Sequence, residues 1–114
     1  MPGNFYVYIL ECSNGRFYTG YTVDLIKRFN EHSSLKKGAK FTRSFKPRKI
    51  AASWKIAGDR GDAMKVEAFI KSLTKPEKIL IAGNPELLAV RVQGLRKLNC
   101  KITVYDYKNP VINC

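Results

Sequence analysis

Two short apolar segments, FYVYIL at 5–10 and FYTGYT at 17–22, lie on either side of the turn-like stretch ECSNGR. Both are rich in aromatic and β-branched residues, which favour strands. Asn14-Gly15 is the dipeptide preferred where a two-residue hairpin turn needs positive φ at both central positions. The pattern therefore predicts an antiparallel hairpin with strands near 5–11 and 16–20, joined by a two-residue turn.

The alternation along the first strand predicts which way its tyrosines point. Successive strand residues face opposite sides of a sheet, so Tyr6 and Tyr8 share one face while Val7 and Ile9 share the other. Tyr18 lies on the neighbouring strand. These tyrosines either pack as ordinary strand aromatics or present their hydroxyls at one place.

Periodicity and capping residues predict the remaining elements. Thr22 is expected to cap a helix that runs to about Ser33. A weaker strand is expected at 49–57, and an amphipathic helix at 60–73. Two short helices should follow, one at 75–82 and one in NPELLAV, opened by Asn84. The order predicts an α+β fold: a small three-stranded antiparallel sheet flanked by helices, in a domain at 1–90. The extension at 91–114 is expected to add a strand or to remain partly disordered.

Length and composition limit the class of protein. A chain of 114 residues, 45% of them hydrophobic, is sufficient for one core. No apolar stretch approaches the roughly 20 residues of a membrane helix, and the start MPGN predicts no secretory signal. Three widely spaced cysteines, Cys12, Cys100 and Cys114, fit neither a disulfide framework nor a zinc site. We therefore expect an intracellular, cytoplasmic protein with reduced thiols.

The charge of the chain indicates its partner. Twenty-one Lys and Arg against nine Asp and Glu give a formal net charge of +12, and no acidic residue lies between Glu31 and Asp59. Basic residues there alternate with Phe41, Phe45 and Trp54, a pattern in which cations meet phosphates and rings stack on bases. A solvated loop is the alternative. The predicted nucleic-acid-binding residues are Lys36, Lys37, Lys40, Arg43, Lys46 and Arg48.

The ordered motifs resemble a known family. YVY at 6–8 is followed by YTG at 18–20, by Arg28 and His32 in DLIKRFNEH, by GAKFTR at 38–43, and by Glu67 in KVEAFIKSL. Over about 5–82 the chain is similar to the small single-domain GIY-YIG nucleases of bacteria. It departs from the family pattern where Tyr6 replaces a glycine, Val7 an isoleucine and Phe41 a common tyrosine.

The resemblance implies a fold, an activity and a set of site residues. The family has a three-stranded antiparallel sheet with helices around it and hydrolyses phosphodiester bonds with one divalent metal, Mg²⁺ or Mn²⁺. DNA is the expected partner, in preference to RNA. The expected DNA substrate is single-stranded or branched, and the expected sequence specificity of cleavage is weak. DNA repair is the expected process. The residues carried over as catalytic are Tyr8, Tyr18, Arg28, His32 and Glu67, the last also as the metal ligand.

These residue types suit phosphodiester hydrolysis. A tyrosine hydroxyl, with an ordinary pKa near 10, needs a nearby cation to act as a base. Arg28 supplies such a cation and a fork of donors for a phosphate oxygen. Glu67 has an alternative reading as a surface ion pair with Lys71, four residues later. It falls only about 40° beyond Ala63 on a helical wheel, however, at the rim of the apolar stripe.

Two other functions remain open at this point. A nucleic-acid-binding module of the same fold that lacks catalysis is favoured by the altered first motif and opposed by the retention of all five candidate residues. A protein-interaction module that uses the fold as a scaffold is the other. Cleavage assays with magnesium or manganese separate the nuclease from both, and salt-dependent DNA binding separates the two binding modules.

Overall fold

A single antiparallel sheet organises the chain. The computed structural model describes residues 3–12, 15–28, 47–92 and 100–105. Its strands are β1 (Gly3–Cys12), β2 (Phe17–Thr22), β3 (Pro47–Gly58) and β4 (Lys101–Val104), in the order β2-β1-β3-β4. The predicted α+β class is confirmed. The strand count is corrected from three to four, because the C-terminal extension adds β4 beside β3. The division at 90/91 stays a prediction.

The β1–β2 hairpin is confirmed, with a longer connection than expected. The Cys12 amide donates to the Arg16 carbonyl at 2.8 Å, and the Gly15 amide donates to the Cys12 carbonyl at 2.9 Å. Three residues therefore separate the paired Cys12 and Arg16, so the prediction of a two-residue turn is wrong. Gly15 has φ of +82°, the left-handed conformation that accompanies three-residue hairpin loops.

Within the described residues 47–92, three helices follow β3, close to where the sequence places them. They are α3 (Arg60–Lys71), α4 (Lys75–Gly83) and α5 (Leu87–Arg91). Thr74 caps α4, and its hydrogen bonds to the Glu77 carboxylate lower the pKa of Glu77. Asn84 does not open α5 as predicted. It ends α4 instead, where its backbone amide donates to the Leu80 carbonyl at 3.0 Å.

A helical turn at 25–28 follows β2. Its cap is Asp24, whose Oδ1 accepts from the Lys27 amide at 3.0 Å. The prediction that Thr22 caps this helix is wrong, because the Thr22 hydroxyl accepts from the Asp24 amide at 3.2 Å and shapes the entry instead. The expected continuation to Ser33 lies outside the described residues.

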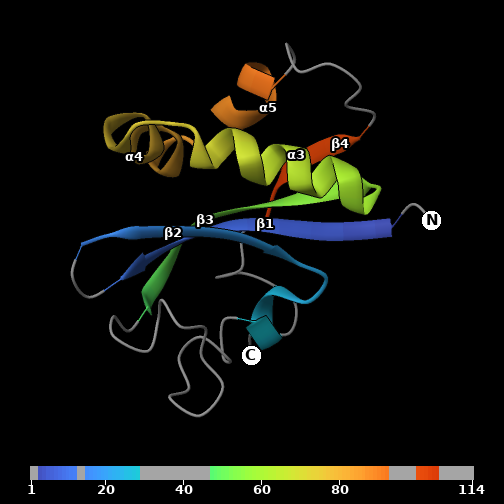
Figure 1. Ribbon diagram of the computed structural model, residues 1–114, viewed down its shortest axis with the longest axis horizontal. Coiled ribbons are helices and arrows are strands. Elements are labelled where there is room, and N and C mark those ends of the chain that lie inside the picture. The colour runs from blue at the N-terminus through green and yellow to red at the C-terminus, as the bar shows by residue number, and fades with distance from the viewer. Residues whose placement is uncertain (1–2, 13–14, 29–46, 93–99, 106–114) are drawn as a thin grey trace.

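The sheet has two differently covered faces. Figure 1 shows α3, α4 and α5 on one side and the turn at 25–28 on the other. The helix side holds the larger core, in which Val7 and Ile9 of β1 pack with Val66 and Ile70 of α3. The opposite side holds a smaller cluster of Tyr8, Leu10, Leu25 and Ile50, with Tyr6, Tyr18 and Tyr105 packed against it. We call this opposite side the tyrosine face.

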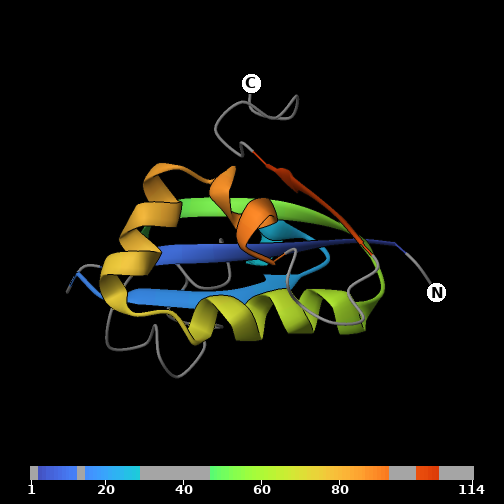
Figure 2. The same cartoon turned by 90° about the horizontal axis from the view of Figure 1, so that it is seen from above.

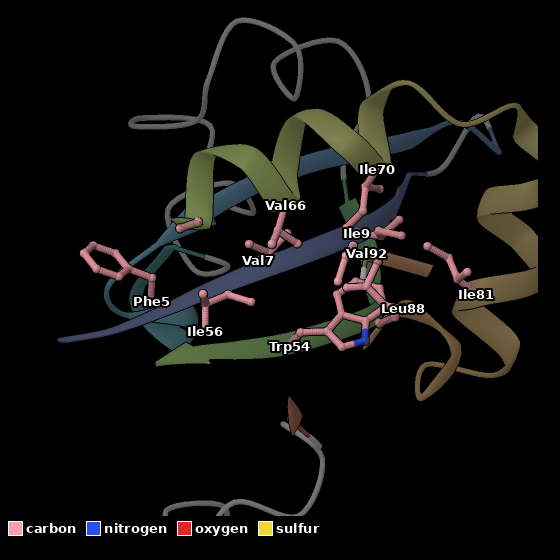
Figure 3. Close-up of a cluster of buried hydrophobic side chains, with 12 residues drawn as sticks. Phe5, Val7, Ile9, Trp54, Ile56, Val66, Ile70, Ile81, Leu88 and Val92 are labelled. Carbon is pink, nitrogen blue, oxygen red and sulfur yellow. The ribbon is translucent and has the colours of Figure 1, made fainter. Parts of the chain in front are cut away.

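Trp54 belongs to the larger core and is unavailable for stacking on bases. Its side chain is fully buried, and its Nε1 donates to the Pro85 carbonyl at 2.7 Å. Figure 3 shows the indole packed beneath Leu88 and Val92. Trp54 pairs with Val7 in the sheet, so both point to the helix side. The expectation that it forms part of a nucleic-acid surface is therefore wrong.

The described cysteines are free thiols. Cys12 is buried and Cys100 half-buried, and burial is the main cause that raises the pKa of each thiol. Such thiols are poorly reactive, which agrees with a structural role. Among the helices in the described part of the chain, none is both long and apolar enough to cross a membrane.

Candidate active site

Tyr8 and Tyr18 lie on the same face of the hairpin. In the β1–β2 register Tyr8 is opposite Gly20, and Leu10 is opposite Tyr18. Residues paired across antiparallel strands point to the same side, and so do residues two apart along a strand. The prediction that Tyr6 and Tyr8 share a face is confirmed by their common cluster. Tyr8 is only 2% exposed, whereas Tyr18 is half-buried.

Gly20, the glycine of the second motif, makes room for Tyr8. A Cβ placed on Gly20 would lie 2.6 Å from the Tyr8 hydroxyl oxygen and 2.9 Å from its Cζ. Both distances are far below van der Waals contact. The Tyr8 phenol thus packs directly against the β2 backbone at Gly20, and a side chain at position 20 would displace the phenol.

We expect Gly20→Ala to destabilise the protein by about 1–3 kcal/mol, the usual cost of overpacking a buried site. The buried Tyr8 ring must shift to admit the new methyl group. Urea denaturation measures the loss. Gly61→Ala is the matched control, because a Cβ there meets no atom within 4 Å. Equal stability of Gly20→Ala and the parent would contradict this account of the motif glycine.

Arg28 approaches the tyrosine face from the helical turn after β2. Leu25 packs against Tyr8 and Leu10, and Arg28 follows Leu25 by three residues, so both lie on one side of the turn. Arg28 is exposed. It lines a surface hollow of about 300 Å³ together with Thr22, Val23, Asp24 and Lys27. A hollow with two cations therefore opens on the helical turn that packs Leu25 into the tyrosine cluster.

Glu67 comes from the other side of the sheet. It lies on α3, which packs on the helix side, and its side chain is 19% exposed with Oε2 at 3.4 Å from the Lys71 Nζ. Two features expected from the sequence therefore occur together: Glu67 lies at the rim of the apolar stripe, and it forms an ion pair with Lys71. The structure does not place Glu67 on the tyrosine face.

The side of α3 that carries Glu67 nevertheless faces the edge strand β2. Arg60 lies within about 20° of Glu67 around the helix, and its Nη1 donates to the Tyr21 hydroxyl at 3.3 Å. This side of α3 therefore faces β2, and Figure 2 shows α3 running along that edge strand. From Arg60 to Glu67 the helix rises about 10 Å, which equals the length of about three residues of a strand, the separation of Tyr21 and Tyr18 along β2. Glu67 thus reaches close to the level of Tyr18, across the edge of the sheet.

The donor chemistry of this edge fits a hydrated hard cation. Among the described residues, no three His, Cys, Asp or Glu side chains gather into a metal-binding group. Magnesium, unlike zinc, commonly takes one or two carboxylates and completes its shell with waters and phosphate oxygens. The Glu67 carboxylate, which is partly exposed, is a suitable single ligand for such an ion.

Several predicted site residues fall outside the described part of the chain. His32 lies there, as do Lys36, Lys37, Lys40, Arg43 and Lys46. Arg48 belongs to β3, but its side chain is not described. Lys27 and Tyr105, which lie on the tyrosine face, were not among the predicted site residues. The alternating stretch KITVY was the available signal for Tyr105, because it continues a strand.

Comparison with known proteins identifies relatives of the chain. A family model described as the GIY-YIG catalytic domain matches residues 4–79. A UPF0213 protein of Syntrophus aciditrophicus is 46% identical over 82 residues, which cover 71% of this chain and 93% of the relative. A UPF0213 protein of Fusobacterium nucleatum is 36% identical over 97 residues, covering 85% and 95% of the two chains.

A solved structure is also similar in sequence. The solution NMR structure of a UPF0213 protein from Bacillus halodurans shares 39% identity with this chain. The match covers 82% of this chain and 89% of that one, with a TM-score of 0.42.

Proposed function

The chain belongs to the GIY-YIG family, and from this premise we propose that it is a metal-dependent endonuclease that hydrolyses phosphodiester bonds in DNA. The family is of nuclease type, and the small UPF0213 relatives carry no more specific activity in their names. Metal dependence, DNA as the substrate and weak sequence specificity are parts of the proposal.

One observation carries the proposal. Tyr8 and Tyr18 point from adjacent strands to one face, and the only helical turn described on that face packs Leu25 into their cluster and carries the exposed Arg28 one turn later. Two phenol hydroxyls and a guanidinium are the groups that can hold a phosphate and the water that attacks it. Such preorganised donors act where charge develops, which is the main source of catalysis in phosphoryl transfer.

The residues of the chain would divide the work as follows. Arg28 would hold a non-bridging phosphate oxygen through its fork of donors. Tyr18, half-buried, would take the proton of the attacking water, while the buried Tyr8 would orient Tyr18 or the phosphate. Glu67 would hold a divalent cation at the β2 edge. Such an ion, when bound, polarises the phosphate and stabilises the leaving oxygen. His32 is proposed as a further member of the site.

The direct test is a cleavage panel. Labelled single strands, duplexes, flaps and branched junctions of DNA, with RNA counterparts, are incubated with the protein in Mg²⁺, in Mn²⁺ and in EDTA. We expect cleavage of DNA in the presence of either metal and none in EDTA. Absence of cleavage in every substrate and metal would contradict the proposed activity.

A DNA-binding module without catalysis is the second candidate. It is favoured by the near-complete burial of Tyr8 and by the position of Glu67 on α3, on the other side of the sheet, paired with Lys71. For this candidate the cleavage panel is negative, while salt-dependent DNA binding persists. The same two measurements therefore separate the candidates without any variant.

The basic window supplies a prediction that both candidates share. Changing Lys36, Lys37 and Lys40 to alanine should weaken binding to all DNA sequences about equally. If each lysine neutralises one phosphate, the slope of log K against log salt should fall by about 0.7–0.9 for each lysine removed. Fluorescence anisotropy over a salt series measures both effects.

The matched control removes three lysines from the helix side of the sheet. These are Lys65 on α3 and Lys75 and Lys78 on α4. Their joint change to alanine lowers the net charge by the same amount, because three lysines are lost in each variant. A similar reduction of the slope in this control would show that only net charge matters. A weakening confined to one DNA sequence would contradict phosphate binding by Lys36, Lys37 and Lys40.

A further inference from the structure

Tyr105 extends the tyrosine face from the C-terminal strand. Its amide donates to the Ser53 carbonyl at 2.9 Å, and the Ser53 hydroxyl donates to the Tyr105 carbonyl at 2.6 Å. Ser53 is in turn the partner of Tyr8. Gly20, Tyr8, Ser53 and Tyr105 thus form one row across the sheet. Residues in such a row point to the same side, so the Tyr105 ring lies on the face that carries the candidate site.

Two aromatic rings meet on this face. The rings of Tyr6 and Tyr105 have centroids 4.9 Å apart and are tilted by 59°. Both side chains are only half-buried. Together with Val23, Asp24, Leu25 and Ile26 they line a surface hollow of about 250 Å³. Sites that enclose a whole small molecule have about 300–1,000 Å³, so this hollow suits one flat ring system.

Cations flank the aromatic pair on two sides. Lys55 of β3 pairs with Tyr6 in the sheet and so points to the same face. Lys27 and Arg28 line the neighbouring hollow, which shares Val23 and Asp24 with the aromatic one. Asp24 is the one acidic residue in either lining. A carboxylate disfavours a phosphate at that point but accepts well from an N–H group of a base.

We propose that Tyr6 and Tyr105 form a stacking subsite for one unpaired base of a DNA strand whose backbone follows Lys55, Lys27 and Arg28. The inference rests on the proposed function in that the base belongs to the strand presented to Tyr8 and Tyr18. Stacking on aromatic side chains with cations along the backbone is the general mode of single-strand binding. A paired base cannot enter, so the subsite selects substrates with unpaired nucleotides.

One of the two rings of the subsite lies outside the catalytic domain match. The family model ends at residue 79, whereas Tyr105 follows β4 in the extension. The extension thus adds Tyr105 as the second ring of the subsite, to which the hairpin contributes Tyr6. This gives the extension a role in substrate choice in addition to closing the edge of β3.

The test compares two oligonucleotides of equal length in EDTA, where cleavage cannot interfere. One is a fluorescein-labelled oligodeoxythymidylate, and the other has the same backbone without bases. The parent protein should bind the first more tightly. In Tyr105→Leu, which keeps apolar packing, this preference should fall by about 5- to 150-fold in Kd, the value of stacking one base. Tyr105→Phe should keep the preference, and the salt dependence should not change in either variant.

Three further measurements make the result decisive. Val104→Ala changes an exposed neighbour on β4 and should keep the preference. Tyr105→Leu should bind duplex DNA as the parent does, because paired bases do not reach the rings. Tyr6→Leu removes the other ring and should reduce the preference similarly, which preserves the test if Tyr105→Leu does not fold.

The inference is overturned if Tyr105→Leu and Tyr6→Leu keep the parent preference for bases. It is also overturned if Tyr105→Phe loses as much as Tyr105→Leu, or if duplex binding falls equally. These readouts are independent of cleavage. A protein without nuclease activity can therefore still show the stacking subsite, and an active nuclease can lack it.

Discussion

Replacement of Glu67 by glutamine is expected to abolish metal-dependent cleavage while leaving the fold and DNA binding intact. The amide keeps the shape of the side chain but removes the charge that holds a divalent cation. Loss of the ion pair with Lys71, whose side chain is 56% exposed, should change stability by less than about 0.5 kcal/mol. Cleavage rates over a Mg²⁺ and Mn²⁺ titration, with thermal melting in parallel, measure the two effects.

Two controls separate the metal role of Glu67 from its ion pair and its charge. Lys71→Ala breaks the same pair but keeps the carboxylate, so it should cleave at close to the parent rate. Glu86→Gln changes the net charge by the same amount at an exposed position before α5 and should also remain active. If Glu67→Gln cleaves like the parent, or if Lys71→Ala loses as much activity, Glu67 is not the metal ligand.

Local patterns predicted most of the fold because the hairpin signals are strong. Strict alternation placed Tyr6 and Tyr8 opposite Val7 and Ile9, and the two core clusters confirm that division. The helices after β3 follow from periodicity and capping. The errors are at boundaries, where several residues compete for one role. Thr22 and Asp24 are both good caps, and only the hydrogen bond from the Lys27 amide shows that Asp24 caps the turn.

Composition was a poor guide where strand alternation matters. Trp54 lies in a window of cations, which suggested a nucleic-acid surface. Its position opposite Val7 turns the indole into the core, whereas its neighbour Lys55 points to the tyrosine face. A single sequence does not specify the pairing of distant strands, so the row that joins Tyr8, Ser53 and Tyr105 was not predictable either.

The candidate site could be predicted only in its local part. The two motif tyrosines share a hairpin, so their common face follows from the register. The position of Glu67 depends on which side of the sheet α3 covers and on its direction along β2, and both are tertiary facts. The helical wheel correctly placed Glu67 at the rim of the apolar stripe of α3. It did not reveal that this rim lies beside the edge strand β2.

Of the two motif tyrosines, Tyr18 gives the cleaner test of catalysis. Tyr8 is buried against the Gly20 backbone, so any change there also disturbs packing. Tyr18 is half-buried, at the strand edge whose level Glu67 approaches from the other side. A phenylalanine at this position keeps the ring and its packing and deletes only the hydroxyl.

We expect Tyr18→Phe to lower the single-turnover cleavage rate by about 10²–10⁴-fold, the usual cost of removing a positioned general base. Melting temperature should change little. Tyr21→Phe is the matched control on the same strand, because its hydroxyl faces α3 and accepts from Arg60 at 3.3 Å. It should lose about 0.5–1.5 kcal/mol of stability, the net value of one hydrogen bond, and keep the parent rate. If Tyr18→Phe cleaves as fast as Tyr21→Phe, the Tyr18 hydroxyl takes no part in the reaction.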